Sequence, residues 1–193
     1  MDGYKMLKFS GESETMMLFA MGLVGVQTMQ WMCVCAAMRT PDASDKAAAA
    51  CVLANALFWL LFAVADGAKV ITDTLPPNFP KETVSLNCFV FLLLASMNVN
   101  AWIAAGMPKP EVKSLVPKGP LATPMLAMMA NLAGFGLGCA FFTEPFVEQF
   151  VPGLLGKFAA GPKAAILMMI SNAGLMMLMN IFSTCLVSAA EPG

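Results

Sequence analysis

Hydrophobic and polar residues occur along this chain in long blocks. Apolar runs that contain no charged side chain cover residues 15–38, 47–65, 83–107, 121–143 and 164–190. An α-helix rises about 1.5 Å per residue, so about 20 apolar residues are enough to cross the hydrocarbon core of a bilayer. We therefore predict five membrane-spanning helices, and we expect the last and longest run to organise the packing of the others.

The stretch between the fourth and fifth runs, residues 144–161, differs from the runs on both sides of it. It contains two glutamates, a lysine and two prolines, with phenylalanine, valine and leucine between them. We predict an interfacial segment that lies flat on the membrane surface. The predicted fold class is therefore all-α: one integral-membrane domain over residues 1–193, a polytopic helical bundle whose two ends lie on opposite sides of the membrane.

Composition and charge narrow the range of functions. The chain is 59% hydrophobic and 12% charged, whereas soluble domains average about 25% charged residues. The net charge of −1 gives no basic face for nucleic acid. The absence of histidine removes the usual general base, haem ligand and zinc ligand. No charged residue lies inside the apolar runs, which disfavours proton-coupled carriers. We predict a protein that is not an enzyme and that holds no metal site of its own side chains.

Carboxamide side chains are the main polar groups inside the apolar runs. The candidate site residues are Gln27, Gln30, Asn55, Asn98, Asn131 and Asn172. An amide in hydrocarbon needs a hydrogen-bond partner. One interpretation is hydrogen bonding between helices. A second is ligation of a pigment, because a carboxamide oxygen is a neutral hard donor that suits the Mg²⁺ of a chlorophyll. A third is a polar path for a small uncharged solute.

Two weaker patterns concern how the helices pack. Gly134 and Gly138 form a G-x-x-x-G pair, which is typical of a close helix contact. Asn55, Asn131 and Asn172 are each flanked by small or apolar residues in similar triplets. These triplets suggest a duplication in which the second and third runs correspond to the fourth and fifth.

These observations lead to two functional hypotheses. The first is a non-catalytic accessory subunit of a larger membrane complex, whose partners are membrane lipid and other integral-membrane subunits. Its specific version is a photosystem subunit of the thylakoid that binds chlorophyll, carotenoid or lipid. The alternative is a small transporter or channel for an uncharged solute, which the polar side chains in every run also allow.

Overall fold

The computed structural model describes residues 9–37, 45–75, 81–107 and 122–190 of the chain. Every regular element in these ranges is helical, which confirms the predicted all-α fold class. The elements in chain order are α1 (Glu12–Ala37), α2 (Asp45–Ile71), α3 (Lys81–Ala104), α4 (Ala122–Phe141), α5 (Thr143–Phe150), the 3₁₀ turn η2 (Leu155–Lys157) and α6 (Ala160–Ala190).

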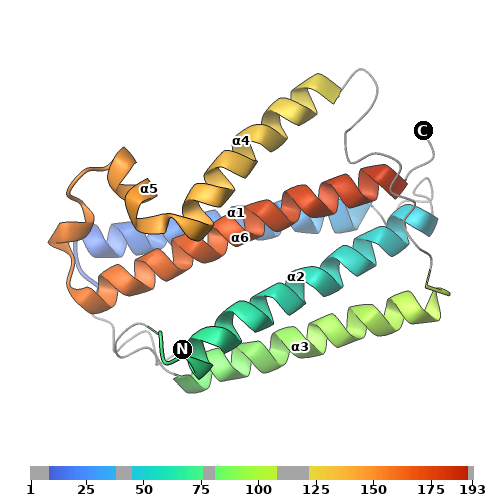
Figure 1. Ribbon diagram of the computed structural model, residues 1–193, viewed down its shortest axis with the longest axis horizontal. Coiled ribbons are helices and arrows are strands. Elements are labelled where there is room, and N and C mark those ends of the chain that lie inside the picture. The colour runs from blue at the N-terminus through green and yellow to red at the C-terminus, as the bar shows by residue number, and fades with distance from the viewer. Residues whose placement is uncertain (1–8, 38–44, 76–80, 108–121, 191–193) are drawn as a thin grey trace.

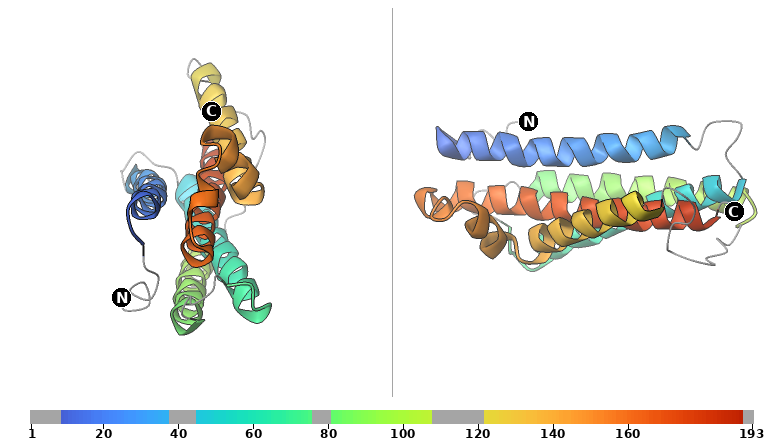
Figure 2. Two further views of the ribbon diagram at one scale, coloured as in Figure 1. Left: turned by 90° about the vertical axis from the view of Figure 1, so that its left-hand side faces the viewer. Right: turned by 90° about the horizontal axis from the view of Figure 1, so that it is seen from above.

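The long helix α6 lies at the centre of the bundle (Figure 1). It packs against α1, α2 and α4, whereas α3 packs mainly against α2. In the end-on view, α1 covers one side of α6, α4 extends from a second side, and α2 leads to α3 on a third (Figure 2). The last apolar run of the sequence therefore does organise the others. The start of α1 and the end of α6 lie at opposite ends of the bundle, while the chain ends themselves lie outside the described residues.

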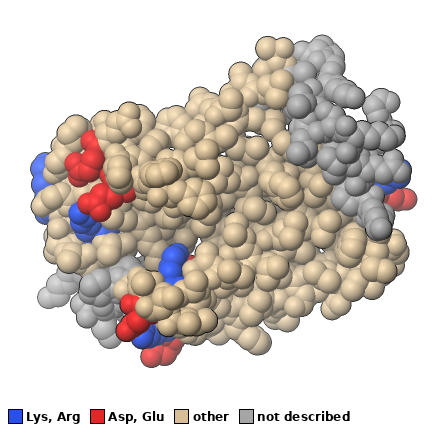
Figure 3. Space-filling model, viewed as in Figure 1, with Lys and Arg blue, Asp and Glu red and all other residues tan. Residues whose placement is uncertain are grey.

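Four helices, α1, α2, α3 and α6, are each long and apolar enough to cross a membrane. A fifth candidate is the pair α4 and α5, which is bent by 117° where the two helices meet. Charged side chains gather toward the ends of the bundle and leave a broad belt without charged residues between them on this face (Figure 3). This arrangement is that of a multi-pass integral-membrane protein.

Helix α5 begins where α4 ends and folds back toward it. Its Phe146 ring meets the rings of Phe135 in α4 and of Phe150, with centroids 5.6 Å and 5.0 Å away. The Glu148 carboxylate accepts hydrogen bonds from the backbone N–H groups of Gly153, at 2.6 Å, and Leu155, at 3.1 Å. The segment predicted as interfacial is thus a short amphipathic helix followed by an anchored turn, although its depth in a membrane stays a prediction.

The closest approach between α4 and α6 occurs at Gly136 and Gly174. A Cβ atom on Gly174 would lie 2.5 Å from the backbone nitrogen of Ala140 and 2.8 Å from the carbonyl oxygen of Gly136. The Ser171 hydroxyl donates a hydrogen bond of 3.0 Å to the Ala140 carbonyl beside this contact. The two helices can lie this close only because both positions lack a side chain.

The predicted G-x-x-x-G pair, Gly134 and Gly138, does not form one contact face within the described chain. A Cβ atom on Gly134 would meet nothing within 4 Å, so this glycine faces outward. Gly138 faces the Phe146 ring of α5, which would lie 2.2 Å from an added Cβ. The helix pairs α2 with α3 and α4 with α6 are the two most extensively packed in the bundle, but the predicted duplication stays a prediction.

Candidate functional site

A pair of buried carboxamides joins α1 to α6. The Asn180 Nδ2 group donates to Gln27 Oε1 at 2.9 Å and to the Gln27 backbone carbonyl at 3.2 Å. Gln27 is 5% exposed and Asn180 is 3% exposed, so neither side chain reaches the lipid-facing surface. Asn180 is a residue that the candidate set omits. The sequence does signal it, because it is a carboxamide inside the last apolar run and lies eight residues after Asn172, which places both on nearly one helix face.

A second polar cluster joins α1 to α2 about one helical turn further along α1. The Trp31 indole N–H donates a hydrogen bond to Asn55 Oδ1. The Asn55 Nδ2 group donates in turn to Cys35 Sγ at 3.6 Å, and Cys35 Sγ lies 3.9 Å from Cys51 Sγ. Ala54 is fully buried beside them, and its small size lets the helices approach. Both ends of the Asn55 amide are therefore satisfied within the chain.

The third cluster joins α2 to α6 through Lys69, which also forms an ion pair within α2. The Lys69 ammonium donates to Asp66 Oδ1 at 3.0 Å and to Asn172 Oδ1 at 3.3 Å. Asp66 is 8% exposed. The predicted second run stops at residue 65, but α2 continues to Ile71 and holds both charges within the helix. A buried carboxylate is tolerated here because a cation and a neighbouring amide lie beside it.

The remaining predicted carboxamides do not join helices. Asn98 Nδ2 donates to the Leu94 carbonyl of its own helix at 2.8 Å. Gln30 and Asn131 form no hydrogen bond with any described residue, and Asn131 is exposed on the outer face of α4. Asn87 and Asn100 of α3 are likewise exposed and without a partner among the described residues. Hydrogen bonding between helices thus applies to Gln27, Asn55 and Asn172, and the other three candidates have a different environment.

A cavity of about 500 Å³ lies between α1, α2, α3 and α6, and we call it the aromatic cavity. Its walls carry the rings of Phe58, Trp59, Phe62 and Phe91. The Trp59 and Phe91 rings are stacked, with centroids 5.4 Å apart and planes at 23°. Its polar lining consists of Thr28, Asp66, Asn87 and Asn172. Carboxamides from two helices and the Asp66 carboxylate of the ion pair therefore line one aromatic-walled space.

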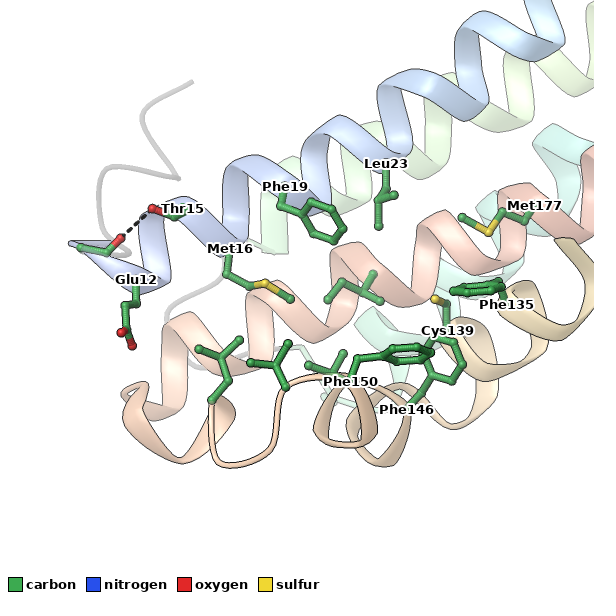
Figure 4. A pocket seen from close by; sticks show the side chains of 15 residues that line it. Glu12, Thr15, Met16, Phe19, Leu23, Phe135, Cys139, Phe146, Phe150 and Met177 are labelled. Carbon is green, nitrogen blue, oxygen red and sulfur yellow. Dashed lines mark hydrogen bonds between the residues drawn. The ribbon is translucent and has the colours of Figure 1, made fainter. Parts of the chain in front are cut away.

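A larger cavity of about 910 Å³ lies between α1 and the helices α4, α5 and α6 (Figure 4). Its side chains are almost all apolar, with Phe19 of α1 facing Phe146 and Phe150 of α5 across the space. Glu12 and Thr15 lie at its end, where Thr15 Oγ1 donates to the Gly11 carbonyl at 3.3 Å. The lining offers van der Waals contact for a lipid chain and hardly any group for chemistry.

Reactive groups are sparse across the part of the chain that the structure describes. No group of three or more histidine, cysteine, aspartate or glutamate residues that could hold a metal ion occurs among the described residues. Compared with protein families, with curated proteins and with solved structures, the chain matches none.

Proposed function

We propose that this protein is a non-catalytic subunit of a larger membrane assembly, held to its neighbours by the outer faces of α3 and α4. The observation that carries the proposal is the exposed Asn131 amide near the middle of α4, which has no partner among the described residues. An unpaired amide in hydrocarbon costs about 2–7 kcal/mol, depending on the reference state. A hydrogen-bond partner on an adjoining subunit removes that penalty.

The surroundings of Asn131 support a contact with another helix. Gly134 lies three residues further along α4 and is also exposed, with nothing within 4 Å of an added Cβ. Residues three apart share a helix face, so the amide stands beside a small residue that admits a close neighbour. Helix α3 offers a second outward face for a contact with another helix. It is described along its whole length, and its only buried residues are Val84 and Ala95.

The specific form of this proposal is a photosynthetic complex with bound pigment. The Asn131 carboxamide oxygen is a neutral hard donor, and the small residues around it leave room for a flat ring. On this hypothesis Asn131 ligates the Mg²⁺ of a chlorophyll at the junction with a neighbouring subunit. Carotenoid or lipid would fill the remaining apolar surface, and the membrane would be the thylakoid.

The test compares Asn131→Leu with Asn131→Gln in the native membrane. Leucine keeps the helix apolar and removes the amide, whereas glutamine keeps the amide. Gentle extraction followed by native gel electrophoresis and absorption spectroscopy would measure the size of the assembly and its pigment. We expect the leucine variant to be released as a smaller particle and the glutamine variant to be partly retained. Wild-type retention of Asn131→Leu would contradict the proposal.

The alternative is a small transporter for an uncharged solute, and one observation favours it. The aromatic cavity presents Thr28, Asn87 and Asn172 in its lining, and such groups suit a neutral polar molecule. Saturable solute flux through the purified chain in vesicles would support this alternative. Such flux would also show that the chain works without partner subunits.

A further inference from the structure

We propose that the aromatic cavity binds a neutral, lipophilic molecule with a flat, carbonyl-bearing ring, of the quinone class. The proposal does not rest on the proposed function, because it concerns the chain by itself. The cavity volume of about 500 Å³ falls within the range of about 300–1,000 Å³ that is typical of small-molecule sites.

The rings supply flat surfaces. Trp59 and Phe91 come from neighbouring helices and stack on each other, and Phe62 meets Phe91 at 6.1 Å and 67°. Phe58 lies edge-on to Trp59 at 5.1 Å. Because aromatic groups prefer offset-stacked and edge-to-face contacts, a flat ring bound in the cavity can make favourable contacts with this aromatic wall. A branched or purely aliphatic occupant would lose that contribution.

The hydrogen-bonding groups in the lining include two free amide donors beside the acceptors of Thr28, Asp66 and Asn87. Asn172 Oδ1 already accepts from Lys69, so this side chain offers its NH₂ group to an occupant. Asn87 has no partner among the described residues, so its NH₂ group is free as well, and so is its carbonyl oxygen. The Thr28 hydroxyl donates to the Val24 carbonyl at 2.9 Å and can only accept another bond. Two free amide donors on α3 and α6 match the carbonyl oxygens of a ring.

The charge of the site argues for an uncharged occupant. Asp66 and Lys69 form an ion pair at 3.0 Å, and together they contribute no net charge. A charged ligand would leave water without meeting a free counter-charge, which is costly inside a membrane. In addition, α1 packs mainly on α6, and α3 packs mainly on α2. The cavity therefore lies between α1 and α3, which have few contacts with each other. A lipophilic molecule can therefore enter from the bilayer.

The test measures binding of a decyl-substituted benzoquinone to the full-length chain in detergent micelles, by quenching of tryptophan fluorescence. Trp31 and Trp59 both line the cavity, and a Trp102→Phe background removes the remaining tryptophan. We expect saturable quenching, with affinity lowered about two- to tenfold in Asn87→Leu, the range for loss of one neutral hydrogen bond. Decylbenzene, which has the same tail and no carbonyl, should fail to compete.

The matched control is Asn100→Leu. It makes the same change on the same helix, at an exposed amide that does not line the cavity, and should bind as the wild type does. Phe91→Leu removes the stacked ring, keeps both reporter tryptophans and should weaken binding. It replaces Asn87→Leu as the test variant if Asn87→Leu does not fold. Equal affinity in Asn87→Leu and Asn100→Leu, quenching that never saturates, or competition by decylbenzene would each overturn the proposal.

Discussion

Replacing Gly174 by alanine tests the packing of α4 on α6 most directly. The added methyl would lie 2.5 Å from the Ala140 nitrogen, 2.7 Å from Cys139 Cβ and 2.8 Å from the Gly136 carbonyl oxygen. Two of these three atoms belong to the backbone of α4, which cannot move aside as the end of a flexible side chain can. The two helices must therefore separate to accept the methyl group.

The magnitude follows from two opposing terms. Overpacking typically costs about 1–3 kcal/mol, and backbone contacts this short place Gly174→Ala at the upper end of that range. Replacing a helical glycine by alanine contributes about 1 kcal/mol in the opposite direction. We expect a net loss of about 2 kcal/mol in the free energy of unfolding. Gly134→Ala gains the same helical preference without a clash, because nothing lies within 4 Å of its added Cβ.

The assay is reversible unfolding in mixed micelles by increasing fractions of dodecyl sulfate, followed by circular dichroism. Gly174→Ala should unfold at a lower fraction than the wild type, and Gly134→Ala at an equal or higher fraction. Both substitutions add the same methyl group to a helical glycine. Opposite changes in the free energy of unfolding would therefore isolate the effect of the contact between α4 and α6. If Gly174→Ala were as stable as Gly134→Ala, the close approach of α4 and α6 would be refuted.

Three further predictions concern the polar clusters and the topology. Lys69→Met should lower the free energy of unfolding by about 3–5 kcal/mol, because it leaves the buried Asp66 unpaired; the double variant Lys69→Met/Asp66→Leu should recover much of that loss in the same assay. Mild copper-phenanthroline oxidation should link Cys35 to Cys51, whose sulfurs lie 3.9 Å apart, and mass spectrometry should find no link from the exposed Cys33. Protease-sensitive tags at the two chain ends should be cut from opposite sides of sealed vesicles, and cleavage of both from one side would contradict an odd number of crossings.

The positions of the helices could be predicted from the sequence because long apolar runs are a local signal. The environment of the two charges near the end of α2 could not be predicted in the same way, since it depends in part on a tertiary contact. Asp66 and Lys69 are tolerated inside the bundle because they neutralise each other and because Asn172 accepts from Lys69. That third residue is more than a hundred positions away along the chain, and no local pattern relates it to α2.

The partners of the carboxamides were beyond sequence reasoning for a similar reason. The amides of Gln27 and Gln30 are three residues apart in α1, yet Gln27 is buried against Asn180 and Gln30 has no partner among the described residues. Which amide is paired depends on how the helix is rotated about its axis, and the weak amphipathic pattern of α1 gives little guidance. The glycines of α4 present the same difficulty: their spacing predicts a contact face, but Gly136, not Gly134, meets α6.

The central position of α6 has a consequence for the order in which the protein is built. A ribosome makes α1, α2, α3 and α4 before α6, yet three of these helices pack mainly or partly on α6. Until α6 enters the bilayer, the hairpin of α2 and α3 is the one extensive helix pair that can assemble. During that interval the Gln27 amide of α1 has no Asn180 to meet. We expect the nascent chain to depend on the insertion machinery while it consists of the α2–α3 hairpin and of α1 and α4 not yet packed. Insertion of α6 then completes the bundle in one step.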